Sequence, residues 1–84
     1  MRKRYYFDVR EGEDISPDDE GMELASLEAV QAEAARALTE MARDTIRKRV
    51  DGARHHMTIE VRDDDGPVLQ VDLTLIIVRH RYKH

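Results

Sequence analysis

The strongest constraint on the fold is a stripe of apolar side chains that recurs every three or four residues between Ser26 and Val50. This spacing puts the stripe on one face of an α-helix. Ser26 precedes it as a candidate N-cap, and Gly52 follows it as a stop. Glu28 lies in the first turn and basic residues 47–49 in the last, as the helix dipole favours. The stripe consists of Leu27, Val30, Ala34, Leu38, Met41 and Thr45.

Alternating segments on both sides of this helix predict the sheet on which it packs. Residues Arg4 to Arg10 alternate, as do Met57 to Arg62 and a run from Val68 to Val78; this pattern is typical of half-buried strands. In the last run one face consists of Leu69, Val71, Leu73, Leu75 and Ile77, and the opposite face consists of Val68, Gln70, Asp72, Thr74, Ile76 and Val78. Residues 63–67 contain Asp-Gly and predict a hairpin turn. Residues 21–24 predict a short strand or an extended lead into the helix. The fold class is therefore α+β, with one helix on a three- to four-stranded antiparallel sheet in the order β-(β)-α-β-β. We expect the helix stripe to meet Phe7, Ile59, Val61, Leu73 and Leu75.

The length of 84 residues indicates a single domain spanning 1–84, with a core that is thin for its surface. There is no cysteine, which removes disulfides and thiolate chemistry and fits a reducing compartment. No apolar run is long enough to span a membrane, and no apolar segment follows the N-terminal charges. These features predict a soluble, cytoplasmic protein.

Charge is distributed unevenly along the chain. Residues 1–4 and the tail 79–84 contain basic residues and no acidic ones, whereas residues 5–78 hold eight basic residues against all eighteen acidic ones, a net charge of −10. If the first and last strands paired antiparallel, the basic ends would merge into one patch able to contact nucleic acid phosphate, with Tyr82 stacking on a base. The residues of this candidate patch are Arg2, Lys3, Arg4, Arg79, Arg81, Tyr82 and Lys83.

The end of the last predicted strand is apolar on both faces. From Leu75 to Val78 no polar residue interrupts the strand, while one helix covers only one side of a sheet. Either Tyr6 of the same chain covers the second face there or a second chain does. Tyr6, Ile76 and Val78 are therefore the candidate interface residues.

No residue pattern in the sequence indicates a catalytic, metal or cofactor site. Asp18, Asp19 and Glu20 lie in an acidic segment, residues 11–21, that is expected to be solvated, whereas catalytic carboxylates need burial or crowding. The spacing of its acids does not fit a calcium loop. His55 and His56 are adjacent and would point to opposite faces of a strand, and the pair at 80 and 84 does not converge either. We expect no enzyme activity, no metal and no cofactor.

Several segments together resemble a known family. They are residues 4–12 (RYYFDVREG), residues 19–24 (DEGMEL), the Leu27-Glu28-Ala29 helix start and residues 59–63 (IEVRD). The chain is thereby similar to short, mainly alphaproteobacterial proteins grouped only as a domain of unknown function. The resemblance implies a bacterial protein and brings no catalytic or binding residue, and the tail from Arg79 lies beyond it. The layout also resembles that of HicB-type antitoxin domains, as an analogy of element order alone.

Two functions follow as alternatives. The first is a non-catalytic interaction or regulatory module, homodimeric or bound to another protein through its sheet edge or the Ile76 and Val78 surface. The second is a nucleic-acid-associated, antitoxin-like regulator that uses the merged basic ends. The first is favoured because most of the chain is acidic.

Overall fold

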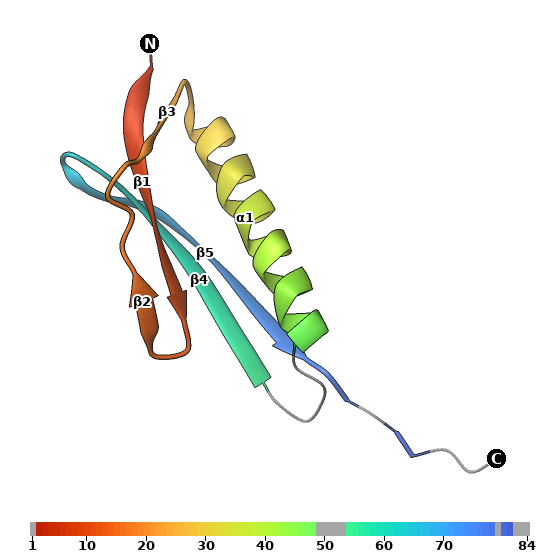
Figure 1. Ribbon diagram of the computed structural model, residues 1–84. Helices are drawn as coiled ribbons and strands as arrows, with labels where there is room; N and C mark the ends of the chain where they lie inside the picture. The colour runs from red at the N-terminus through yellow and green to blue at the C-terminus, as the bar shows by residue number, and fades with distance from the viewer. Residues whose placement is uncertain (1, 49–53, 79, 82–84) are drawn as a thin grey trace.

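A computed structural model describes residues 2–48, 54–78 and 80–81 and shows one helix beside a five-stranded antiparallel sheet (Figure 1). The predicted α+β fold is confirmed, with three strands rather than one or two before the helix. The predicted helix end at Val50 and stop at Gly52 lie outside the described residues. In chain order the elements are β1 (Lys3–Glu11), β2 (Asp14–Ser16), β3 (Met22–Leu24), α1 (Leu27–Lys48), β4 (Arg54–Asp63) and β5 (Gly66–Ile76).

The strand order is β2-β1-β4-β5, and β3 also pairs with β1. One edge of β1 pairs with β4 from Tyr6 to Glu11. Its other edge is shared, because β3 pairs with Lys3–Tyr5 and β2 pairs with Val9–Glu11. Of the two alternatives for residues 21–24, the short strand is therefore confirmed, as β3. A further strand, β2, lies inside the segment that the sequence indicated to be loop only.

The core lies between α1 and the middle of the sheet. Val30 and Ala34 of α1 are fully buried, as are Met57 and Ile59 of β4, and Leu38 is nearly so. The predicted partners of the helix are confirmed, since Ile59 and Val61 are buried and Phe7, Leu73 and Leu75 pack against this cluster. Leu27 was wrongly placed in the stripe. It lies in the first turn of α1, and its side chain is 55% exposed.

The N-terminus of α1 is capped as the sequence predicts. The backbone N–H of Ala29 donates to Ser26 Oγ at 3.1 Å, and the Val30 N–H donates to the Ser26 carbonyl at the same distance. The serine thus satisfies a backbone donor of the first turn that has no partner within the helix.

The hairpin between β4 and β5 turns one residue earlier than predicted. Asp63 stands opposite Gly66, so the loop residues are Asp64 and Asp65 rather than Asp65 and Gly66. The Asp65 backbone N–H donates to Asp63 Oδ1 at 2.8 Å and fixes the turn. Gly66 has a φ of 126°, a conformation that other residues rarely adopt.

A β-bulge follows this turn. Arg62 pairs with Pro67 while Val61 pairs with Leu69, so Val68 is an extra residue in β5. Because of the bulge, Val68 packs against the core instead of joining the polar second face, where simple alternation had placed it. Beyond the bulge the prediction holds, and Leu69, Val71, Leu73 and Leu75 lie on the helix side.

Candidate functional site

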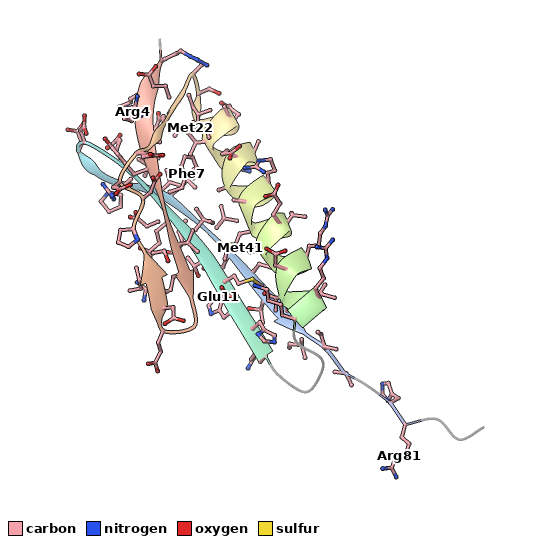
Figure 2. The ribbon with its side chains drawn as sticks, in the orientation of Figure 1. Arg4, Phe7, Glu11, Met22, Met41 and Arg81 are labelled. Atoms are coloured by element: carbon pink, nitrogen blue, oxygen red, sulfur yellow. The ribbon has the colours of Figure 1, made fainter. Side chains whose placement is uncertain are left out.

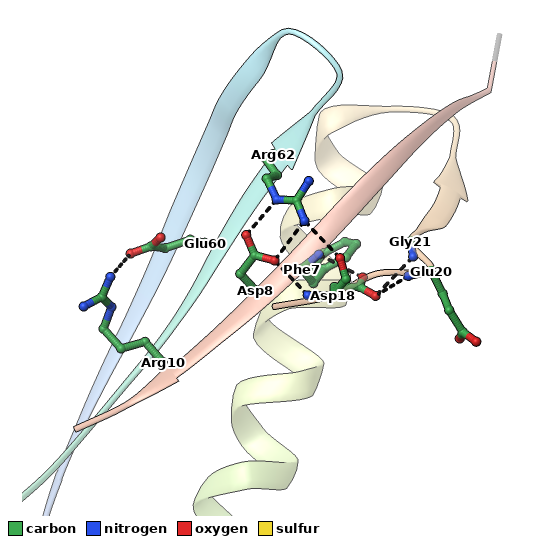
Figure 3. Close-up of polar contacts among 8 residues, drawn as sticks. All are labelled: Phe7, Asp8, Arg10, Asp18, Glu20, Gly21, Glu60 and Arg62. Carbon is green, nitrogen blue, oxygen red and sulfur yellow. Dashed lines mark hydrogen bonds and ion pairs between the residues drawn. The ribbon is translucent and has the colours of Figure 1, made fainter. Parts of the chain in front are cut away.

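The sheet face opposite α1 is polar, and its charges are paired with one another. Arg62 Nε donates to Asp8 Oδ2 at 2.8 Å, and Arg10 lies 3.4 Å from the Glu60 carboxylate (Figure 3). Thr58 Oγ1 donates to Asp72 Oδ1 at 2.6 Å and is itself buried. This face is consistent with contact with water rather than with a second apolar layer.

A cluster of polar contacts, which we call the Asp18 clip, joins residues 17–21 to the polar face (Figure 3). It consists of Asp8, Asp18, Gly21 and Arg62. The Asp18 N–H donates to Asp8 Oδ1 at 2.9 Å, and Arg62 Nη2 donates to the Asp18 carbonyl oxygen at 2.9 Å. Arg62 also lies over the Tyr6 ring, 4.6 Å from its centroid, so the guanidinium is held between carboxylate and aromatic ring.

The Asp18 side chain fills a gap in the pairing of β1. At Phe7, between the stretches paired with β3 and β2, none of the described strands faces the outer edge of β1. There the Phe7 backbone N–H donates to Asp18 Oδ2 at 3.1 Å. Asp18 Oδ1 accepts from the N–H groups of Glu20 and Gly21, at 3.0 and 3.1 Å. One carboxylate therefore satisfies an edge donor and fixes the turn into β3.

Gly21 is required at the end of this clip. Its φ is +75°, and a Cβ there would lie 2.9 Å from Arg4 Cγ, 2.9 Å from Tyr6 Cε2 and 3.0 Å from the Tyr5 carbonyl oxygen. The backbone oxygen cannot move away without disturbing β1. A side chain at residue 21 would therefore push the turn off the sheet.

The electrostatics of the clip favour the charged form of both acids. Burial raises the pKa of Asp8, but the hydrogen bonds from Arg62 and from the Asp18 N–H, with the Arg62 charge, bring it below the ordinary value. Burial likewise raises the pKa of Asp18, and the N–H groups of Phe7, Gly21 and Glu20 outweigh it, so this pKa is lowered too. Acids held charged in this way suit an architectural role, whereas a general acid needs a raised pKa.

The prediction that the acidic segment is simply solvated was wrong for Asp18, which is half-buried and bonded, and right for its exposed neighbours Asp19 and Glu20. The missed residues Asp8 and Arg62 lie 54 positions apart in the chain, and only the sheet brings them together. A signal was present in the sequence, because Asp18 is followed three residues later by Gly21, a spacing typical of side-chain-capped turns.

The merged basic patch does not form. β4 lies between β1 and β5, so these two strands run parallel, and the described ends of the chain lie at opposite ends of the sheet. Figure 2 shows Arg4 and Arg81 far apart. Arg2 is exposed at the start of the chain near Lys3, while Arg79, Tyr82 and Lys83 lie outside the described residues.

The N-terminal bases instead meet acids. Lys3 Nζ lies 2.9 Å from the Asp63 carboxylate, and Arg4 donates to the Glu20 carbonyl oxygen at 2.7 Å and to Glu23 at 3.3 Å. Asp63 raises the pKa of Lys3, which keeps the amine charged. The nucleic-acid interpretation thus loses the merged patch on which it depended.

The three candidate interface residues do not form one surface. Tyr6 stands opposite Arg62 near the hairpin turn, whereas Ile76 stands opposite Arg54 at the other end of β4. Tyr6 therefore does not cover the apolar end of the sheet. Ile76 and Val78 are 55% and 66% exposed, so the alternative of a second chain remains for that surface.

The two adjacent histidines point to opposite faces, as predicted. His56 lies on the polar face, 3.6 Å from Asp72, and His55 lines a groove of about 440 Å³ beside Thr45 and Glu11 on the helix side. His55 Nε2 is buried there without a hydrogen-bond partner among the described residues. Within residues 2–48, 54–78 and 80–81 no three potential ligands converge as a metal ion would require.

A second groove, of about 430 Å³, opens beside the hairpin bulge. Its mainly apolar wall includes Pro67, Val68 and Leu69, and its rim includes Gln70 and Glu60. Because the Asp8 and Arg62 groups at this groove already bond each other, its apolar part is the portion that remains open to a ligand or partner.

Comparison with known proteins places the chain in a family. The model of a family described as a domain of unknown function (DUF6894) matches residues 4–74. No curated protein and no solved structure matches the chain. The match ends before Arg79, so the resemblance drawn from the sequence is confirmed together with its C-terminal limit, and the HicB-type layout remains a prediction. Among the described residues, no helix is long and apolar enough to cross a membrane.

Proposed function

The chain belongs to the DUF6894 family, and from the surface that its fold leaves uncovered we propose that it is a non-catalytic interaction module that acts as a homodimer. The observation that carries this proposal is the apolar end of β5. Ile76 and Val78 are the two most exposed large apolar residues at that end, and they adjoin a strand whose outer edge pairs with none of the described strands. Exposed apolar surface next to an unpaired strand edge is a common docking surface for proteins.

The chemistry of the polar groups supports a role without catalysis. Two of the partly buried carboxylates, those of Asp8 and Asp18, are occupied by backbone N–H groups and by Arg62, and they help to hold the fold. Of the hydroxyls, Ser26 caps α1 and Thr58 is bonded to Asp72. Each of these groups has a structural partner that accounts for its position.

Solution mass tests the proposal. We expect the protein to be a dimer at micromolar concentration by light scattering, and Ile76→Asp to shift it to monomer, because a charge cannot be buried without a partner. The matched control is Ile15→Asp, since Ile15 is 54% exposed on β2, at the opposite side of the sheet. A wild-type protein that stays monomeric at several hundred micromolar would count against the homodimer.

A further inference from the structure

We propose that the partner on the β5 edge is a second copy of this chain, paired antiparallel to β5 about a two-fold axis at Leu73. This inference rests on the proposed function and specifies its partner and geometry. The two sheets would join into one continuous sheet across the interface, with an α1 helix on the same side of each half.

The first observation is that burial is incomplete on the β5 side of the core. On the helix side, Met57, Ile59 and Val61 of β4 are 0–1% exposed. Their neighbours in β5, among them Val71 and Leu73, carry the same kind of side chain but are only partly buried. Among the described residues no strand pairs with the outer edge of β5. An added strand would complete the cover of this apolar row.

The second observation is that the edge lacks charges that would oppose such pairing. Strand edges of soluble proteins are commonly protected by lysine, proline or a bulge. In β5 the proline and the bulge lie at its start, at Pro67 and Val68. From Leu69 to Val78 the single charged residue is Asp72, and its carboxylate is held by Thr58 and Gln70 on its own chain.

Charge excludes two neighbouring registers of the pairing. With the axis at Leu73, Asp72 stands opposite Thr74 of the second copy, and Val71 stands opposite its Leu75. An axis at Asp72 would bring two like charges face to face, and an axis at Thr74 would place Asp72 opposite Ile76. Like charges directly opposite each other destabilise an antiparallel pair, and apolar pairs stabilise it. The axis at Leu73 avoids both conflicts.

The same register brings the exposed Ile76 of one copy beside the groove at the hairpin bulge of the other copy. It places Ile76 opposite Gln70 of the second copy, and both residues lie on the polar face of their sheets. Gln70 and Val68 both line the groove of about 430 Å³ beside the hairpin bulge. The exposed Ile76 at the end of β5 therefore contacts the groove at the start of β5 of the other copy. The two-fold axis makes this contact twice, as a closed dimer requires.

Disulfide trapping tests the register, because the chain contains no cysteine of its own. Residues directly opposite in an antiparallel pair have Cα atoms about 4.5–5.5 Å apart, within the range of a disulfide. Leu73→Cys is therefore expected to form a covalent dimer on mild oxidation. Val71→Cys alone is not, because the two cysteines would lie about 13 Å apart along the strands. A mixture of Val71→Cys and Leu75→Cys should link again.

A charge test at an exposed position avoids any effect of core substitutions on folding. Thr74→Asp places a second acid opposite Asp72 at two points of the dimer and is expected to weaken dimerisation about tenfold or more. Thr74→Lys provides opposite charges at the same points and should leave the dimer at least as tight. Equal weakening by both variants would contradict the Leu73 register, since lysine and aspartate would then act only as edge charges.

The outcomes separate this inference from the proposed function. A wild-type monomer overturns both. A dimer that Ile76→Asp disrupts, but in which Val71→Cys alone cross-links and Leu73→Cys does not, overturns the edge pairing and keeps the interaction module. A dimer that Ile15→Asp disrupts instead places the interface on β2 and overturns the pairing as well.

Discussion

The outer edges of β1 and β5 differ in how their backbone groups are paired. The outer edge of β1 is covered along its length by β3, by the Asp18 carboxylate and by β2. The outer edge of β5, a strand of eleven residues, faces no strand among the described residues, and past its bulge it has no proline or basic residue to block pairing. The sequence segment between β1 and α1 is thus used almost entirely to close one edge.

This difference indicates that the β1 edge is stabilised by contacts within the chain, whereas the β5 edge is open to pairing with a partner. On the β1 edge the donors of the backbone are satisfied within the chain, so pairing with a partner there would require the Asp18 clip to open. On the β5 edge the pairing groups are available at no such cost. Four changes test the closed edge, in order of the effect expected.

The largest effect is expected for Asp18→Ala. It removes the acceptor for Phe7, Glu20 and Gly21 and leaves a partly buried N–H of β1 without a partner, so the free energy of unfolding should fall by about 2–3 kcal/mol. Urea unfolding followed by circular dichroism measures this. Asp19→Ala is the matched control, because Asp19 is the exposed adjacent acid. Equal losses in the two variants would show that the clip does not secure this edge.

A somewhat smaller loss is expected for Gly21→Ala. The positive φ and the close approach to the Tyr5 carbonyl oxygen should together cost about 2 kcal/mol. Gly12→Ala is the control, since Gly12 also has a positive φ, of 62°, but a Cβ added there would have no neighbouring atom within 4 Å. It should lose only the conformational part, about 1 kcal/mol. Thermal unfolding of the two variants gives the difference, and equal losses would mean that the approach to β1 costs nothing.

The free energy of unfolding that the Asp18 clip contributes should fall at acidic pH. Asp8 and Asp18 have lowered pKa values in the folded protein, so the unfolded chain takes up protons first, near its value of about 3.8. The contribution of these two carboxylates to the free energy of unfolding is fully present above the unfolded pKa. It is lost as the pH falls through their lower pKa values in the folded protein. In urea titrations from about pH 6 to about pH 2, Asp8→Asn should show a shallower loss. An unchanged slope would contradict the role of Asp8 in the clip.

The smallest effect is expected for Ile15→Ser. β2 covers β1 through backbone pairing, and the Ile15 side chain is largely exposed on the polar face, so stability should change by no more than about 0.5 kcal/mol. The same urea experiment measures it. A loss above about 1 kcal/mol would mean that β2 closes the edge through side-chain packing, and the contrast between the two edges would then not hold.

Local patterns predicted much of the fold correctly. Helical spacing placed α1 within one residue of its observed start at Leu27, and the serine cap is where its hydroxyl predicted. Alternation identified β1, β4 and β5, although β1 and β4 extend beyond the predicted runs, and β5 begins earlier than predicted and ends at Ile76, before Val78. These features depend on residues close together in the chain, so periodicity and turn chemistry suffice to indicate them.

The polar site was not predictable to the same degree. Asp18 was assigned to a solvated loop because nothing nearby in sequence shows that Phe7 of β1 would lack a strand partner. Val68 was assigned to the wrong face because a bulge adds one residue without a clear sequence signal at that point. Both errors concern pairing partners that are distant in sequence.

The sequence by itself determined the element types, the apolar face of the helix and the family. The tertiary structure decided the strand order, and with it the placement of β4 between β1 and β5. That order separates the basic ends, joins Asp8 to Arg62 and leaves β5 at the edge of the sheet. The reason is physical: the side-chain pattern of a strand fixes which face is buried, whereas its neighbours depend on backbone pairing, which every residue pattern of this kind allows.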